Sequence, residues 1–285
     1  GTFGRFTNYP LCPSLAASLL LDAGSREHMR RRRMKYGQHM LVSTAIADHF
    51  ISSCNLGQNS RVLEIGSGRG ILTQKLAEQV GFVKSFEVDH ALFEATKRLV
   101  SSYKNVQLIQ ADAFCYGLKN ERFDACVTSL PYSESLRFIK WLVQKTNRFN
   151  LVAAIVQAEF AKKLTARPGE SSYRAVSVMA QISFEIEALF NVGRYSFSPP
   201  PKVESTAIQL IPTSEMTRPF FNRERIRILD LVFSFRGRRL YSALKKLLPG
   251  KNVETIFEDI LAARVETISP KDYSKIIQQV EEFLA

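Results

Sequence analysis

Residues 62–70 read Val-Leu-Glu-Ile-Gly-Ser-Gly-Arg-Gly, and this stretch decides the fold. A short aliphatic run leads directly into a turn with three glycines, and residues 72–80 continue with helical spacing. Glycine lets a backbone turn tightly and come close to a ligand at the carboxyl end of a parallel strand, where α/β sheets bind their ligands. The stretch therefore predicts a strand, a ligand-binding turn and a helix.

The pattern alternates between β-rich and helical segments from residue 60 to about residue 212. Such alternation is typical of βαβ units, in which a parallel sheet has helices on both faces. We therefore predict an α/β fold with a Rossmann-like sheet, and two further strands, 182–192 and 205–211, at one edge. The predicted parallel strands are 61–65, 83–88, 106–109, 125–130 and 151–156, and the helices are 72–80, 91–103, 135–146 and 158–164.

The β pattern ends after Pro212, and the remaining chain has helical spacing over 223–235, 239–248, 253–263 and 270–284. We place a domain boundary near residue 213, which gives a Rossmann-like domain over 30–212 and a small all-α domain over 213–285. Residues 1–29 differ from both, because they begin with Gly and end in a Gly-Ser-Arg-Glu-His-Met run that is typical of a cloning junction. We expect them to be an expression leader outside the fold.

The charge of the chain favours a polyanionic partner. It has 39 Lys and Arg against 27 Asp and Glu, a formal net charge of +12 with a pI near 9.6. Such an excess favours nucleic acid or an acidic membrane surface. Residues 218–251 alone hold ten basic and two acidic side chains. No apolar run approaches the ~20 residues of a membrane-spanning helix, so we expect no membrane partner.

The four cysteines argue against a metal centre. Cys12, Cys54, Cys115 and Cys126 form no CxxC pair and no cluster with histidine. A structural zinc site or a disulfide framework needs such a pattern. We therefore expect no metal and a reducing, cytoplasmic location.

Two acidic residues follow the glycine turn at strand ends. Glu87 closes the next predicted strand, 21 residues after Gly66, where an acidic side chain can accept both ribose hydroxyls of a nucleoside cofactor. Asp112 follows the third strand, where it can accept the adenine amino group. The spacing G-x-G-x-G differs from the dinucleotide fingerprint G-x-G-x-x-G, and it favours S-adenosylmethionine over a nicotinamide cofactor.

The fourth strand ends in Ser129-Leu130-Pro131-Tyr132, and with this motif the chain resembles a known family. It is similar to the ribosomal RNA adenine N6-dimethyltransferases, the small-subunit dimethyladenosine transferases. The resemblance runs in order from about residue 35 to 248. The matching stretches are 37–41, 64–70, 87–89, 112–113, 129–132, 157–161, 166–170, 197–205 and 235–239.

The resemblance implies an S-adenosylmethionine-dependent methyltransferase that dimethylates N6 of two adjacent adenosines near the 3′ end of small-subunit rRNA, with a role in small-subunit biogenesis. The implied catalytic residues would accept hydrogen bonds from N6 or stack on the extruded base. They are Ser129, Leu130, Pro131, Tyr132 and Phe197. The implied cofactor contacts are Gln38, His39, Leu41, Gly66, Ser67, Gly68, Glu87, Val88, Asp112, Ala113 and Ser129.

Two of these positions depart from the family. Ser129 stands where the family has Asn, and Ser67 where it favours Pro. Adenine N6 is a poor nucleophile because its lone pair is delocalised into the ring, and acceptors that hold its N–H groups orient that lone pair. A hydroxyl reaches less far than an amide oxygen. We therefore expect Ser129 to slow the chemistry rather than to abolish it.

The basic C-terminal segment is the expected RNA-binding surface, because Arg and Lys on helices neutralise phosphates with little sequence readout. The expected contacts are Arg218, Arg223, Arg225, Arg227, Arg236, Arg238, Arg239, Lys245 and Lys246. We expect the partner to be small-subunit rRNA or a small-subunit precursor particle, and the protein to act as a monomer.

Two other functions stay open at this level. One is a macrolide-resistance-type methyltransferase that modifies a large-subunit adenosine, although the Pro-Pro-Pro-Lys-Val run at 199–203 fits the small-subunit group better. The other is a ribosome-assembly factor that binds RNA with weak or no catalysis, a reading that only Ser129 favours.

Overall fold

The computed structural model describes residues 39–118, 121–213, 218–257 and 259–284. The expected leader and Gln38 therefore lie outside the described residues. Seven strands form one sheet in the order β4-β3-β2-β5-β6-β9-β7. The first five are parallel, β9 pairs antiparallel with β6, and β7 pairs antiparallel with β9. Their bounds are β2 Arg61–Ile65, β3 Phe82–Glu87, β4 Val106–Gln110, β5 Phe123–Thr128, β6 Phe149–Gln157, β7 Phe184–Val192 and β9 Ser205–Pro212.

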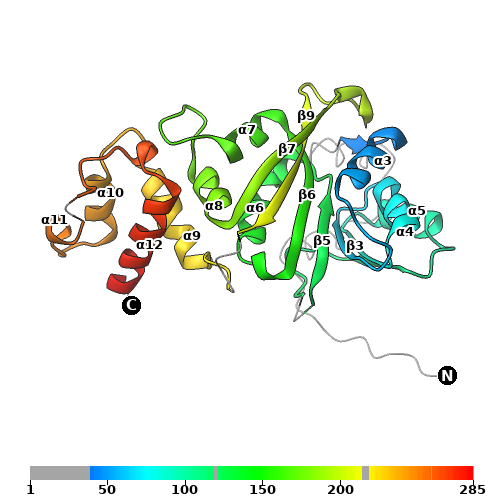
Figure 1. Cartoon of the computed structure of the whole chain (residues 1–285), viewed down its shortest axis with the longest axis horizontal. Helices are drawn as coiled ribbons and strands as arrows, with labels where there is room; N and C mark the ends of the chain where they lie inside the picture. The colour runs from blue at the N-terminus through cyan, green and yellow to red at the C-terminus, as the bar shows by residue number, and fades with distance from the viewer. Residues whose placement is uncertain (1–38, 119–120, 214–217, 258, 285) are drawn as a thin grey trace, which may run out of the picture.

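Helices cover both faces of the sheet (Figure 1). Neighbouring side chains of a strand point to opposite faces, and in β2 Val62 and Leu63 accordingly belong to two different buried clusters. The Val62 side packs against α3 (Thr44–Ser53) and α4 (Ile71–Gln79). The Leu63 side packs against α6 (Ser135–Leu142), α7 (Ala158–Thr165) and α8 (Ala175–Ser183). Helix α5 (His90–Leu99) lies beside α4 and contacts β3 and β4.

The predicted α/β fold is confirmed, two local expectations need correction, and one element was not expected. Helix α8 occupies residues 175–183, so the predicted strand 182–192 begins only at Phe184. A two-strand ribbon, β1 (Met40–Leu41) with β8 (Phe197–Ser198), was not expected. Helix α11 ends at Ile256 instead of continuing to residue 263. The carbonyls of Leu261 and Ala263 accept hydrogen bonds from the start of α10 instead of continuing a helix.

The C-terminal segment is helical, as expected, and continues the buried core of the Leu63 face. Its helices are α9 (Arg223–Phe233), α10 (Leu240–Leu247), α11 (Val253–Ile256) and α12 (Pro270–Leu284). They lie at one end of the molecule, next to α8 and remote from α4 and α5 (Figure 1). The Tyr173 hydroxyl, beside α8, donates to the Ile268 carbonyl at 2.9 Å. Near residue 213 the secondary structure changes from strands to helices, but one buried apolar cluster includes residues from both sides of this point.

We predict that Tyr173→Phe destabilises the protein by about 1 kcal/mol, because the buried Ile268 carbonyl loses its donor. Urea unfolding followed by circular dichroism measures this loss. Tyr103→Phe is the matched control, since its hydroxyl donates to Glu78 at the exposed surface, and its effect should stay within about 0.5 kcal/mol. Equal effects of the two variants would contradict a stabilising link between α8 and the C-terminal helices.

Candidate active site

The glycine turn lies at the carboxyl end of β2. Gly66, Gly68 and Gly70 all have positive φ, the region that L side chains avoid. The N–H groups of Gly66 and Ser67 both donate to the Phe86 carbonyl, at 2.9 and 3.1 Å. Space is open where a Cβ on Gly68 would stand, with no atom within 4 Å. The turn is thus tied to β3 while its middle stays accessible to a ligand.

Helix α5 holds the same turn from the other side. The Thr96 hydroxyl donates to the Gly68 carbonyl at 3.1 Å. A Cβ on Gly70, where φ is +82°, would lie 2.9 Å from Leu99 and 3.1 Å from Thr96, so a side chain there would strain the backbone and press against α5. Sequence reasoning missed Thr96, because its role depends on a contact between segments 28 residues apart.

Glu87 lies at the end of β3, and its side chain contacts the glycine turn. One carboxylate oxygen accepts from the Gly68 N–H at 2.8 Å, and the other accepts from the N–H groups of Val88 and Asp89 at 2.9 Å each. Burial raises the pKa of Glu87, and these backbone donors oppose the rise. The neighbouring Val88 side chain is 54% exposed, so an acidic group and an apolar group flank the same turn.

Glu64 is a fully buried carboxyl group beneath the turn. One oxygen accepts from the hydroxyls of Thr73 and Ser85, at 2.7 and 2.6 Å, and the other has no partner in the described chain. Burial raises its pKa to about 7. An unpartnered buried oxygen is uncommon in folded proteins, and this one is closed off from solvent in the ligand-free chain.

Asp112 follows β4, and its carboxylate is engaged on both oxygens. One accepts from the Phe114 N–H at 2.9 Å, and the other from the Arg137 guanidinium at 2.6 Å. Arg137 also reaches Glu134 at 3.2 Å and lies over the Phe114 ring. An adenine amino group at Asp112 therefore has to share this carboxylate with Arg137. The following Ala113 is buried.

Residues 129–132 lie next to the glycine turn because β5 pairs with β2, with Thr128 opposite Ile65. A Cβ on Gly66 would lie 3.4 Å from Leu130. Ser129, Leu130 and Pro131 are partly exposed. The Tyr132 hydroxyl shares a 2.6 Å hydrogen bond with Ser205, and burial raises the pKa of Tyr132, which keeps the phenol neutral.

The β1–β8 ribbon lies beside Tyr132 and brings in residues distant in the chain. Leu41 pairs with Phe197, and both are buried. His39 approaches Tyr132 with 5.6 Å between ring centroids, and its Nδ1 lies 2.7 Å from the Pro199 carbonyl. The predicted catalytic and cofactor residues within the described chain thus gather at one edge of the sheet, with Phe197 buried in the ribbon.

Comparison with known proteins shows the family of the chain. A family model described as "Ribosomal RNA adenine dimethylase" matches residues 29–282. The chain belongs to this family.

Individual relatives agree with the family model. The chain is 31% identical over 249 residues to "Ribosomal RNA small subunit methyltransferase A" of Nitrosococcus oceani, covering 85% of this chain and 94% of that protein. The protein of the same name from Borrelia garinii subsp. bavariensis is 27% identical over 254 residues, with 88% and 89% covered.

Solved structures of related enzymes share the fold. A dimethyladenosine transferase from Plasmodium falciparum superposes with a TM-score of 0.71 at 26% identity, covering 86% of this chain and 98% of that one. The 23S rRNA methyltransferase ErmE follows with a TM-score of 0.61 at 24% identity, covering 85% and 99%, which shows the fold alone.

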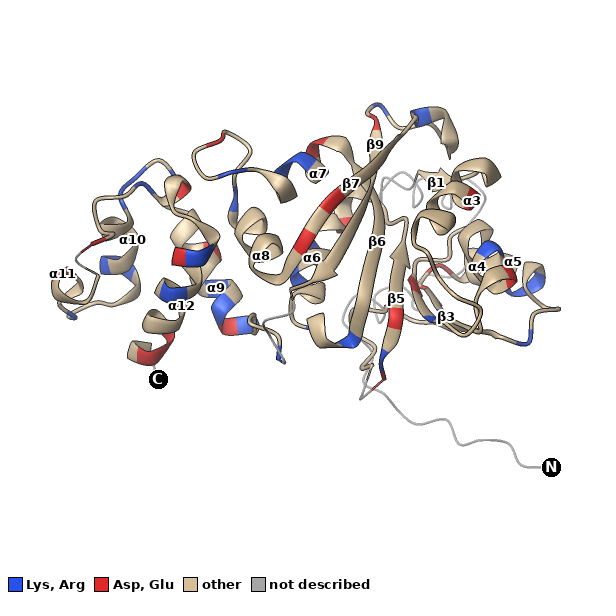
Figure 2. Ribbon diagram, in the orientation of Figure 1, with Lys and Arg blue, Asp and Glu red and all other residues tan. Residues whose placement is uncertain are grey.

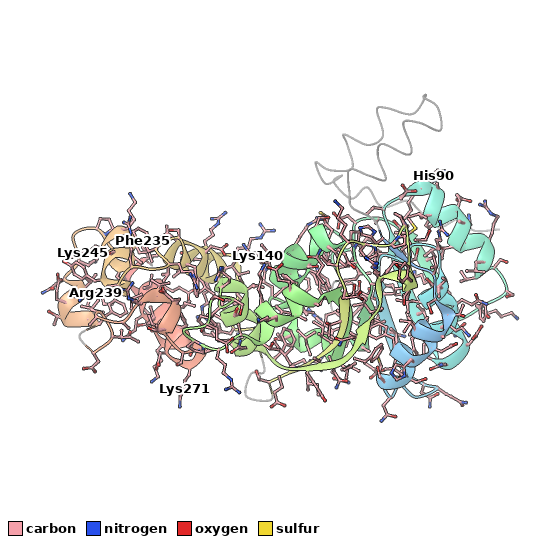
Figure 3. The ribbon with its side chains drawn as sticks, turned by 90° about the horizontal axis from the view of Figure 1, so that it is seen from above. His90, Lys140, Phe235, Arg239, Lys245 and Lys271 are labelled. Atoms are coloured by element: carbon pink, nitrogen blue, oxygen red, sulfur yellow. The ribbon has the colours of Figure 1, made fainter. Side chains whose placement is uncertain are left out.

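In this dimethylase, the expected RNA-binding residues divide into two groups. Arg225 pairs with Glu281 at 2.6 Å, Lys245 pairs with Glu254 at 3.2 Å, and Arg236 donates to backbone carbonyls near Tyr173. The remaining side chains are exposed and have no ion pair within the described residues. They are Arg218, Arg223, Arg227, Arg238, Arg239 and Lys246. Figure 3 shows Arg239 and Lys245 at the end of the molecule opposite His90.

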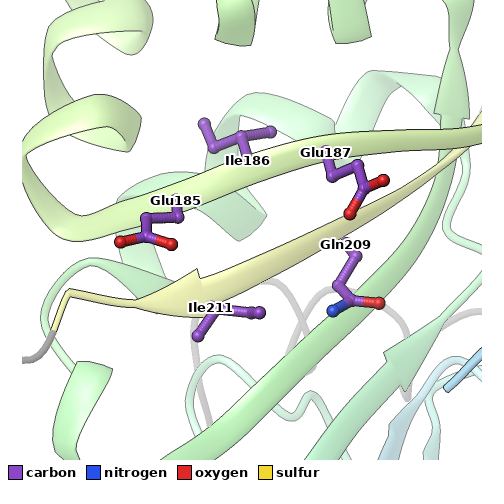
Figure 4. Close-up of a pocket in the computed structure, with 5 residues that line it drawn as sticks. All are labelled: Glu185, Ile186, Glu187, Gln209 and Ile211. Atoms are coloured by element: carbon purple, nitrogen blue, oxygen red, sulfur yellow. The ribbon is translucent and has the colours of Figure 1, made fainter. Parts of the chain in front are cut away.

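Two surface hollows lie away from the glycine turn of the dimethylase. One, between β7 and β9, is lined by Glu185, Ile186, Glu187, Gln209 and Ile211 (Figure 4). The carboxylates of Glu185 and Glu187 make the binding of an anion there unfavourable. The second lies at the amino ends of β2, β5 and β6 and contains three arginines.

Two negative findings apply to the described part of the dimethylase. No group of three or more His, Cys, Asp and Glu side chains there is placed to hold a metal ion. None of the helices described is both long enough and apolar enough to cross a bilayer.

We predict that Glu64→Gln gains stability over the unchanged protein as the pH rises from about 4.5 to 7. The folded-state pKa of Glu64 lies above its unfolded value of 4.5, so ionisation above pH 4.5 stabilises the unfolded chain more and lowers the free energy of unfolding. The expected gain is about 3 kcal/mol above pH 7 and vanishes below pH 4.5. Urea unfolding of both ligand-free proteins across this range measures it, and a difference independent of pH would contradict the assignment.

Proposed function

We propose that this chain uses S-adenosylmethionine to dimethylate N6 of two adjacent adenosines near the 3′ end of small-subunit rRNA. Membership of the dimethylase family supports the reaction, and the names of the relatives support the small subunit over the large one. The observation that carries the proposal is the meeting of the glycine turn with residues 129–132 at one edge of the sheet.

The residues around the turn fit the cofactor. Glu87 and Val88 present an acidic and an apolar group for a ribose and an adenine, as this type of sheet binds nucleosides. Asp112 and Ala113 lie at the adjoining strand end, and Gly66, Ser67 and Gly68 offer a close backbone approach. When bound, the cofactor supplies an electrophilic methyl group on a cationic sulfur.

The chain's own part in catalysis is positioning. The Pro131 carbonyl and the Ser129 hydroxyl accept hydrogen bonds from adenine N6, which turns its lone pair out of conjugation and aims it at the methyl carbon. Tyr132 offers a ring face for the extruded base, as base-modifying enzymes require. Phe197 is the proposed second face. Phe197 belongs to β8 and is 3% exposed, so a base can stack on its ring only if the packing around that ring opens.

His39 and Leu41 complete the proposed cofactor contacts from the ribbon. His39 lies against Tyr132 and the Pro199 carbonyl, which places it between the ribbon and the motif at 129–132. In this proposal the imidazole helps to close the site and is not a general base.

The helical segment 213–285 is the proposed RNA-binding domain, and residues 30–212 the methyltransferase domain. The exposed arginines of α9 and of residues 236–239 neutralise phosphates and supply affinity rather than base readout. We propose small-subunit rRNA in a precursor particle as the substrate, a monomeric enzyme and a cytoplasmic location.

Methylation of small ribosomal subunits from a methylation-deficient strain tests the function. We expect transfer of labelled methyl groups to two adjacent adenosines near the 3′ end of the rRNA, located by mass mapping of nuclease fragments. Modification of a large-subunit adenosine, or cofactor binding without methyl transfer, would contradict the proposal.

We predict that Ser129→Asn raises the rate of methyl transfer by roughly 10- to 100-fold, because a better-placed acceptor is worth about 1–3 kcal/mol in the transition state. Single-turnover methylation of undermethylated subunits measures the rate. Ser101→Asn, at an exposed turn after α5, is the matched control and should leave it unchanged. A Ser129→Asn rate equal to or below that of the unchanged enzyme would contradict the assigned role.

A further inference from the structure

The amino ends of the parallel strands form a basic hollow on the edge of the sheet opposite the proposed active site. This hollow, of about 310 Å3, is lined by Arg61, Arg122, Phe123, Asp124, Asn147, Arg148 and Asn150. Ligands of α/β sheets bind at the carboxyl edge. The proposed function therefore leaves the hollow without a role.

Strand pairing brings the arginines together. Phe123 of β5 pairs with Phe149 of β6, so the preceding residues, Arg122 and Arg148, enter the sheet side by side. Arg61 begins β2, on the other side of β5. The strand register thus gathers three guanidinium groups from segments far apart in the sequence.

The three guanidinium groups have no ion pair or hydrogen-bond acceptor within the part of the chain that the structure describes. Arg61 lies over the Phe82 ring at 4.5 Å, which holds the guanidinium in place without neutralising it. Asp124 is the carboxylate of the hollow. Its two oxygens accept from the backbone N–H of Arg61 at 2.8 Å and from the Asn150 side-chain amide at 3.4 Å.

The positive charge continues from the hollow to the C-terminal helices. Burial lowers the pKa of Lys145, and the nearby charges of Arg148 and Arg223 lower it further, so Lys145 lies between the hollow and the start of α9. Arg223 is exposed at the start of α9. Figure 2 shows basic residues at the lower ends of β5 and β6 and along α9. Unpaired like charges held together repel, and a bound anion removes that repulsion.

We propose that this hollow, with Lys145 and Arg223, is a second phosphate-binding surface for the RNA substrate. This inference rests on the proposed function. Strand β5 rises about 3.3 Å per residue, so Arg122 and Ser129 lie roughly 20 Å apart at opposite ends of it. No single nucleotide spans that distance. The surface therefore fits the backbone of a folded RNA that reaches from the carboxyl edge past α9 to the amino edge.

The double variant Arg122→Gln/Arg148→Gln tests the surface. The probes are the isolated 3′-terminal fragment of small-subunit rRNA and whole methylation-deficient subunits, titrated at several salt concentrations. We expect the Kd for both to rise about tenfold, and the slope of log K against log salt to shrink by about 1.5, since each lost phosphate contact removes roughly 0.7–0.9. KM for methylation should rise with kcat unchanged.

Lys97→Gln/Arg98→Gln is the matched control, because it removes the same charge from the exposed surface of α5 and should change Kd less than twofold. Arg122→Lys/Arg148→Lys keeps the charge and should retain most of the affinity. If the double Gln variant does not fold, Arg122→Glu at an exposed position replaces it, with an expected loss of at least tenfold.

The outcomes separate this inference from the proposed function. If the double Gln variant has the affinity and salt slope of the control, the hollow does not bind RNA phosphates, even when the unchanged enzyme methylates normally. Weaker binding to whole subunits with unchanged binding to the isolated RNA also overturns it, because the partner is then a ribosomal protein. Absence of methyl transfer by the unchanged enzyme contradicts the proposed function. The RNA affinities of the variants then still show whether the hollow binds RNA.

Discussion

The candidate site depends on the way the Glu87 carboxylate ties the glycine turn to the end of β3. Its oxygens accept three backbone N–H groups, from Gly68, Val88 and Asp89. A turn with three positive-φ glycines has little intrinsic order, and this carboxylate, the Phe86 carbonyl and Thr96 together hold it in place. In the proposed function the same carboxylate binds the ribose of the nucleoside cofactor, so one side chain would both order the turn and contact the ligand.

The two edges of the sheet carry different kinds of side chains. The carboxyl edge gathers buried acidic groups, the Ser-Leu-Pro-Tyr motif and aromatic rings, which suit a cationic cofactor and a flat base. The amino edge and the exposed side of the C-terminal helices carry unpaired arginines, which suit phosphates. A substrate that satisfies both edges is large, negatively charged and able to present one unstacked base. A folded RNA has these properties.

Local patterns in the sequence predicted the central sheet, the turn and the acidic strand ends, because each depends on a few neighbouring residues. Helix α8 was missed since six of its nine residues are buried, which leaves no polar face to reveal a helical period. The sequence could not reveal that Arg137 pairs with Asp112, or that Glu281 neutralises Arg225. These pairs join residues 25 and 56 positions apart, which only the tertiary fold brings together.

Calorimetric titration of the ligand-free protein with S-adenosylmethionine tests the central claim most directly. The account predicts saturable uptake of one cofactor per chain, with affinity reduced at least tenfold in Glu87→Gln, because the amide cannot accept the same set of backbone and ribose donors. The absence of any uptake by the unchanged protein, or equal affinity in the variant, would contradict the assignment of this turn as the cofactor site.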